Sequence, residues 1–130
     1  MMPRGHAPFI GIHHVQLLAP LGSEAVARQF YGDLLGLAEI GRPVEPPALS
    51  GLSFQCGEQE LQIAFREDCQ PLCAAHVSLQ MVNATTLGAL QVKLELEGLD
   101  VQADDSVDRY RRFLVSDPFG NQLEFMCPRY

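Results

Sequence analysis

The sequence has no tryptophan, no long run of apolar residues and few basic side chains. Nine lysines and arginines stand against 16 aspartates and glutamates, which gives a formal net charge of -7. Nucleic acids and phospholipid surfaces bind basic faces, so this charge balance argues against both classes of partner. No apolar run approaches the length of a membrane span. Residues 1–8 lack the apolar core of a signal peptide, so we expect a cytoplasmic protein.

Cysteine is also scarce, with four residues at Cys56, Cys69, Cys73 and Cys127. An even number is compatible with disulfides, and Cys69 and Cys73 have a spacing that could supply half of a zinc site. However, nothing indicates secretion, and the other two cysteines lie singly in apolar strand contexts. We therefore interpret the cysteines as buried free thiols.

The chain does have a 47% apolar content over 130 residues, which is enough for one globular domain with a real core. Within it, the two halves match at an offset of 62 residues, the separation of His14 and His76. The same offset, without a gap, pairs Val15 with Val77, Leu17 with Leu79, Gly36-Leu37 with Gly98-Leu99, Leu61 with Leu123, and Gln62 with Glu124. A duplicated unit buries its apolar face by pairing with its twin, so the repeat indicates the architecture.

Local patterns predict the same order of elements in each half. In residues 9–66 we expect strands at 9–18, 37–40, 52–56 and 60–65, with a helix over 24–35 capped by Ser23 and ended by Gly36. In residues 74–127 we expect strands at 74–81, 99–102, 110–115 and 122–127, with a helix that begins at Asn83 or Thr85 and ends near Glu97. Proline-rich residues 41–50 and acidic residues 104–108 are expected loops, and 117–121 a turn. The predicted fold is α+β, a single domain over residues 1–130 made of two βαβββ modules, 9–66 and 74–127.

Strand alternation separates the side chains of each predicted sheet into two faces. The apolar set should face a helix: Val15, Leu17, Leu61, Ile63, Phe65, Val77, Leu79, Leu123 and Phe125. The opposite set is polar: His14, Gln16, Gln62, Arg66, His76, Ser78, Gln80, Gln122 and Glu124, with Ala64 and Met126. If the two sheets curve around a common hollow, these polar side chains line it. Burying so many polar groups is costly unless something binds them.

The repeated polar residues His14 and His76, together with Glu124, form a set of metal-ligand type. A single histidine on a strand is more often a packed residue than a ligand, but His76 repeats His14 and all three residues share the polar face. Two imidazoles, a carboxylate and the Gln62 amide make a mixed nitrogen and oxygen site that suits Zn, Ni, Fe, Co or Mn. Gln62 either ligates weakly or only hydrogen-bonds a metal-bound water. His13 has the opposite parity, so we interpret it as a structural residue on the helix side or at the strand edge.

Four motifs, in order and on the internal offset, resemble the vicinal oxygen chelate superfamily. They are IHHVQL at the first strand, FYGDLLGL at the helix end, AHVSL at the second module and DPFGNQLEF at the last hairpin. The superfamily includes glyoxalase I, fosfomycin-resistance transferases, extradiol dioxygenases and bleomycin-binding proteins. The resemblance covers about residues 10–127 and implies a cupped mixed β-sheet with helices outside. It also implies a divalent metal held by His14, Gln62, His76 and Glu124.

The resemblance implies a metal-dependent lyase or isomerase of glyoxalase type that acts on a small carbonyl or thiohemiacetal compound. Two features depart from glyoxalase I. Leu18 stands where an arginine helps to hold glutathione, and Gln62 stands where most bacterial enzymes have a glutamate. Glu124 would then be the single catalytic carboxylate. Two alternatives stay open: an iron-dependent ring-cleaving dioxygenase, and a non-catalytic protein that binds a drug or metabolite.

The predicted substrate pocket comprises Gln16, Arg66, Ser78 and Met126. Arg66 could pair with an anionic group of a substrate, although a surface arginine at a strand end is the simpler interpretation. The expected partner is a small molecule. In many small proteins of the superfamily a second chain completes the cup, so the resemblance implies a homodimer, although two modules can also form the cup within one chain. If the cup forms between two chains, His14 of one subunit faces His76 and Glu124 of the other.

Overall fold

The computed structural model describes residues 8–41, 50–69, 75–104 and 109–128. The first module contains β1 (His14–Pro20), α1 (Glu24–Ala27), the π-helix η2 (Arg28–Leu34), β2 (Ala38–Ile40), β3 (Ser50–Cys56) and β4 (Gln59–Arg66). The second contains β5 (His76–Gln80), α2 (Ala84–Leu96), β6 (Gln102–Ala103), β7 (Tyr110–Ser116) and β8 (Gln122–Pro128). This order confirms the predicted α+β fold with two βαβββ modules.

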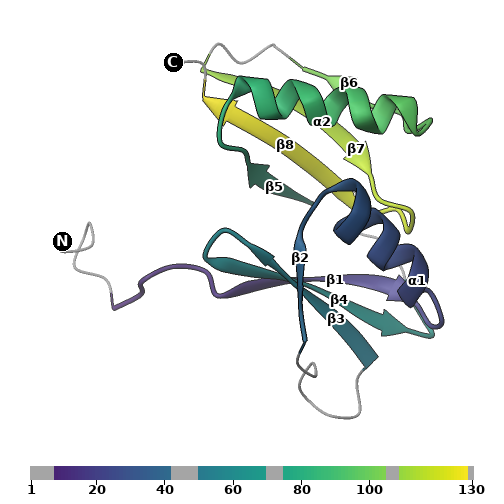
Figure 1. Ribbon diagram of the computed structural model, residues 1–130. Helices are drawn as coiled ribbons and strands as arrows, with labels where there is room; N and C mark the ends of the chain where they lie inside the picture. The colour runs from purple at the N-terminus through teal and green to yellow at the C-terminus, as the bar shows by residue number, and fades with distance from the viewer. Residues whose placement is uncertain (1–7, 42–49, 70–74, 105–108, 129–130) are drawn as a thin grey trace.

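Each module forms one mixed four-stranded sheet, in the order β1-β4-β3-β2 or β5-β8-β7-β6 (Figure 1). The outer strands β1 and β5 pair in parallel with β4 and β8, and the other neighbours are antiparallel. The β3–β4 hairpin turns at Gly57, which has a φ of 59°. Because a side chain is strained at positive φ, this tight turn favours glycine. Within the described ranges, no helix has the length and hydropathy of a membrane span.

The predicted apolar faces are confirmed as the buried ones. Leu61, Ile63, Phe65, Leu123 and Phe125 are all buried, and the apolar residues of β1 and β5 pack against them. The helix α2 contributes Leu87, Leu90 and Leu94, as predicted. Buried residues of both modules belong to one hydrophobic cluster. The two covered faces therefore share a single core, and the uncovered faces lie outside it.

Several predicted boundaries and orientations are wrong. The first strand begins at His14 rather than Phe9, because its partner β4 begins only after the Gly57 turn and pairs with β1 from Glu60 onward. Phe9, Ile10 and Ile12 are instead exposed. The strand expected over 99–102 is the short β6 at Gln102–Ala103. Residues 42–49 and 105–108 of the expected loops lie outside the described residues.

The helix ends also differ in detail. Ser23 precedes α1 but makes no capping bond to it, and its hydroxyl donates to the Pro20 carbonyl instead. The change to a π-helix at Arg28 alters which side chains face inward, so Val26 is 44% exposed while Ala27 and Phe30 are buried. Asn83, one of the two expected caps, accepts a hydrogen bond from the Thr86 amide in a capping box.

The cysteine prediction holds in part. Cys127 is buried, whereas Cys56 and Cys69 are only partly buried, and all three are free. Burial raises the pKa of the Cys56 thiol above its ordinary value. Cys73 lies outside the described residues.

The two modules are tied together where the α1–η2 segment meets the turn before β8 (Figure 1). The buried Tyr31 hydroxyl donates to Asp117 Oδ2 at 2.5 Å. Asp117 also accepts hydrogen bonds from the side chain and backbone amide of Asn121 and from the Phe119 amide. The Asn121 side chain in turn donates to the Leu18 carbonyl at 2.9 Å. A buried polar network of this kind fixes the orientation of its members.

Because of this contact between Tyr31 and Asp117, we expect the free energy of unfolding to fall in alkaline solution. Burial, with the charge and hydrogen bond of Asp117, raises the pKa of Tyr31 above its ordinary value of 10.0. Above about pH 10 the unfolded chain therefore releases a proton that the folded chain retains, and the free energy of unfolding falls as the pH rises. We expect Tyr31→Phe to lack this component. Urea unfolding from about pH 8 to 11 tests it, and equal pH slopes in the two proteins would contradict it.

Candidate functional site

The strand registers place the predicted ligands in two half-sites, one on the uncovered face of each sheet. In the first module His14 and Gln16 lie opposite Glu60 and Gln62 on parallel strands. In the second module His76 and Ser78 lie opposite Gln122 and Glu124. Each half-site therefore combines an imidazole at the start of an outer strand with an oxygen donor on the neighbouring strand.

The half-site of the second module is centred on Glu124, which is 6% exposed. The Ser78 hydroxyl donates to its Oε1 at 2.7 Å, and Arg112 donates to its Oε2 at 3.1 Å. A second nitrogen of Arg112 donates to Asp104 at 2.8 Å. These bonds fix the orientation of the buried carboxylate and supply it with a counter-charge. Ser78, a predicted pocket residue, thus contacts the predicted catalytic carboxylate directly.

Arg112 is a site residue that the sequence reasoning missed. It pairs opposite Met126 in the β7–β8 ladder, so its side chain belongs to the same uncovered face as Glu124. Alternation along the predicted strand 110–115 carried the signal. Arg112 and Leu114 point to the uncovered face of the sheet, whereas Phe113 and Val115 point to the buried face. A charged residue on the strand next to Glu124 is therefore a candidate for this half-site.

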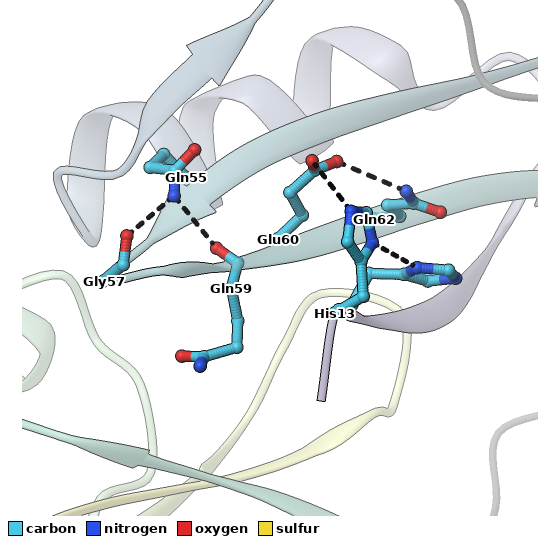
Figure 2. A network of polar contacts seen from close by, with 7 residues as sticks. His13, Gln55, Gly57, Gln59, Glu60 and Gln62 are labelled. Atoms are coloured by element: carbon cyan, nitrogen blue, oxygen red, sulfur yellow. Dashed lines mark hydrogen bonds and ion pairs between the residues drawn. The ribbon is translucent and has the colours of Figure 1, made fainter. Parts of the chain in front are cut away.

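The half-site of the first module is a polar cluster around Glu60 (Figure 2). His13 Nε2 lies 4.0 Å from Glu60 Oε2, and the Gln62 amide nitrogen donates to Glu60 Oε1 at 3.4 Å. The Nδ1 atoms of His13 and His14 are 3.0 Å apart. His13 lies just before the outer strand β1 with its side chain 75% exposed, so of its two predicted positions the strand edge is confirmed and the helix side is wrong. It belongs instead to the polar cluster.

Within one chain these two half-sites stay separate. Among the described residues, no group of three or more histidine, cysteine, aspartate or glutamate side chains is close enough to hold a metal ion. His14 therefore does not meet His76 and Glu124 in the same chain. The shared core provides the physical reason, because modules that pack through their covered faces leave their uncovered faces on the outside.

The other three predicted pocket residues, Gln16, Met126 and Arg66, lie at different places on the two sheets. Gln16 is exposed next to Gln62, and Met126 is partly buried next to Glu124. Arg66 pairs with Pro20, at the opposite end of β1 from His14. Six residues of strand correspond to about 20 Å, so Arg66 lies well away from His14, whereas Gln62 is only four residues from Arg66 on β4. A substrate that reached both Arg66 and a metal ion at His14 would have to be long.

A separate cavity of about 520 Å³ lies beside the Gly57 turn and β5. Its wall includes Ile12, Val15, Leu61, Val77 and Leu79. These residues belong to the arm before β1 and to the apolar faces. Glu60 and Ser78 also line the cavity, whereas none of the four predicted metal ligands does. The four predicted ligands therefore lie on the uncovered faces, and this cavity touches those faces through Glu60 and Ser78.

The donor set itself fits a divalent transition metal. His14 and His76 supply nitrogen, while Gln62 and Glu124 supply oxygen, and such mixed sets suit Zn, Ni, Fe, Co or Mn better than Ca. A ligand carboxylate is commonly oriented by further hydrogen bonds, as Ser78 and Arg112 orient Glu124.

Comparison with known proteins gives the family. The sequence profile of the Glyoxalase/Bleomycin resistance protein/Dioxygenase superfamily matches residues 11–125. A protein assigned to the glyoxalase family, from Bacillus anthracis, is 37% identical with a TM-score of 0.84, and the match covers 93% of this chain and 97% of that one. The chain belongs to this superfamily, which is the vicinal oxygen chelate group that its motifs resemble.

More distant solved structures share the fold. The lactoylglutathione lyase from Agrobacterium tumefaciens has a TM-score of 0.71 at 19% identity, with 93% of this chain and 96% of that one covered. A genomically encoded fosfomycin resistance protein from Listeria monocytogenes has a TM-score of 0.74 at 13% identity, with 92% and 93% covered. A search of curated proteins gave no match.

Proposed function

We propose that this protein is a divalent-metal-dependent lyase or isomerase that acts on a small carbonyl or thiohemiacetal compound. The observation that carries the proposal is the pair of half-sites, each with an imidazole and an oxygen donor on neighbouring parallel strands. Members of the superfamily generally use divalent metal ions and bind small-molecule substrates. The proposed ligands are His14, Gln62, His76 and Glu124.

The proposed site is completed by a second copy of the chain. Each uncovered face carries half of the donor set, and the shared core keeps the two faces apart within one chain. The outer strands β1 and β5 each have one edge without a partner strand among the described residues, and such edges favour association with another sheet. In a two-fold dimer, module one of each subunit faces module two of the other, which gives two equivalent sites.

The residues of the chain then have distinct tasks. A bound divalent cation would polarise the substrate carbonyl and stabilise negative charge on its oxygen. Glu124, which Ser78 and Arg112 hold in place, is the carboxylate that accepts the substrate proton and returns it. Arg112 donates to both Glu124 and Asp104, so it holds the catalytic carboxylate in place rather than contacting the substrate. Gln62 cannot share the proton transfer, because an amide is not a base.

The experiment combines metal analysis with isotope exchange. Protein purified without chelator is assayed for bound metal, and then for solvent deuterium uptake into thiohemiacetals of methylglyoxal formed with several thiols. We expect a bound divalent metal and deuterium in the product. Oxygen consumption with catechols on an iron-loaded protein would replace the proposal with a ring-cleaving dioxygenase. Unchanged ligand binding in His76→Ala and Glu124→Ala would replace it with a metal-free binding protein.

A further inference from the structure

Glu60 contacts one predicted ligand of the first half-site, Gln62, and lies beside His13, whose ring contacts the other predicted ligand, His14. Its backbone amide donates to the His13 carbonyl at 3.0 Å, which anchors it beside the start of β1. Its side chain is only 11% exposed. Figure 2 places its carboxylate between the His13 ring and the Gln62 amide. One oxygen faces each of them.

We propose that Glu60 is a positioning residue that fixes which atoms of His14 and Gln62 are available to a metal ion. The inference rests on the proposed metal site, but it concerns ring tautomers and amide orientation that exist without metal. It gives His13 and Glu60 a role beyond the predicted ligand set.

The direction of the hydrogen bonds follows from the chemistry of the partners. An ionised carboxylate only accepts, and at 4.0 Å its negative charge favours a hydrogen on the nearer ring nitrogen of a neutral His13, which is Nε2. His13 Nδ1 is then an acceptor, and the 3.0 Å contact requires His14 to donate from its own Nδ1. His14 Nε2 is left with its lone pair exposed, in the form that binds a metal ion.

The same carboxylate orients Gln62. The amide nitrogen of Gln62 is 3.4 Å from Glu60 Oε1, and a carboxylate accepts from NH₂ but repels a carbonyl oxygen. The amide oxygen is therefore the atom left for a cation. Glu60 thus turns both residues so that each presents an unshared electron pair.

The internal repeat shows that this arrangement is particular to the first module. At the offset of 62, Glu60 corresponds to Gln122 and Gln62 to Glu124, so the acid and the amide exchange places. The Gln122 side chain donates to the Ser116 hydroxyl at 2.7 Å, so it is held by the neighbouring strand β7. In the second module the acid, Glu124, occupies the proposed ligand position. In the first module the acid, Glu60, lies two residues before that position and supports an amide ligand, Gln62.

The test uses the complete chain with Glu60→Gln and His13→Ala, and Glu58→Gln as the matched control on the exposed hairpin. Long-range ¹H–¹⁵N spectra of metal-free protein, in mildly alkaline solution where imidazoles are neutral, report the tautomer of His14. We expect a hydrogen on Nδ1 in the wild type and the control, and a mixture of tautomers in both variants. The affinity for Zn²⁺, measured by competition with a chromophoric chelator, should fall by about 10- to 100-fold in Glu60→Gln.

A hydrogen on His14 Nε2 in the wild type would overturn the inference, as would an unchanged His14 tautomer in Glu60→Gln. His13→Ala changes a largely exposed side chain, so it reports on His14 even if Glu60→Gln fails to fold. Failure of the proposed function has a different result: the wild type binds no metal while the tautomer of His14 still depends on His13.

Discussion

Replacing Glu124 with glutamine should lower the affinity of the protein for divalent metal by about 100-fold or more. The estimate follows from the loss of 10- to 100-fold that is typical when only a supporting partner of a ligand is removed. Glutamine keeps the size of the side chain and can still contact Ser78, but it loses the negative charge that both Arg112 and a cation require. The same substitution should abolish deuterium uptake into product, because no second carboxylate takes part.

The measurement is a competition titration of apo-protein against a chelator of known affinity. Glu95→Gln is the control, since Glu95 is an exposed charge on α2. Circular dichroism and urea unfolding establish that the variant is folded. An affinity within about twofold of the wild type, less than the loss expected even for a supporting partner, would exclude Glu124 as a ligand.

Replacing Asp117 with alanine should lower the free energy of unfolding by about 3 kcal/mol or more. The substitution leaves the buried Tyr31 hydroxyl and the donors of Asn121 without their acceptor, and each such group costs about 1–3 kcal/mol. It also removes the acceptor of the Phe119 amide in the turn before β8. The effect is large because one side chain joins the two modules as well as shaping a turn.

Urea unfolding of the wild type, Asp117→Ala, Tyr31→Phe and the double variant tests this prediction. Tyr31→Phe should cost less, about 1–2 kcal/mol, because Asp117 keeps its other donors. The two effects should not add, since the residues are bonded to each other. A loss below about 1 kcal/mol in Asp117→Ala, the lower end for one unsatisfied buried group, would show that the junction contributes little.

The sequence predicted the fold because the repeat and the strand alternation are both local, countable patterns. The offset that pairs His14 with His76 identified two like modules, and the parity of β4 and β8 assigned Leu61 and Leu123 to the core. Element boundaries were less accurate because pairing depends on the partner strand. Nothing in residues 9–13 indicates that β4 begins too late to pair with them.

The composition of the half-sites was also partly predictable. The polar parity gave Glu124 and Gln62, and the structure adds Arg112 and Glu60 from the same faces. Both residues have the parity of the predicted ligands, so alternation along the predicted strands 60–65 and 110–115 carries a signal for each of them. The relative placement of the modules could not be predicted, since it depends on long-range contacts such as that between Tyr31 and Asp117.

The central claim, that each metal site is built from two chains, is tested most directly by subunit mixing. His14→Ala and Glu124→Ala each break every site in their own homodimer. A mixed dimer retains one complete site, with His14 and Gln62 from one chain and His76 and Glu124 from the other. Random pairing of equal amounts should therefore restore about one quarter of the wild-type metal sites. Native mass spectrometry counts the mixed dimers, and mixed dimers that bind no metal would contradict the account.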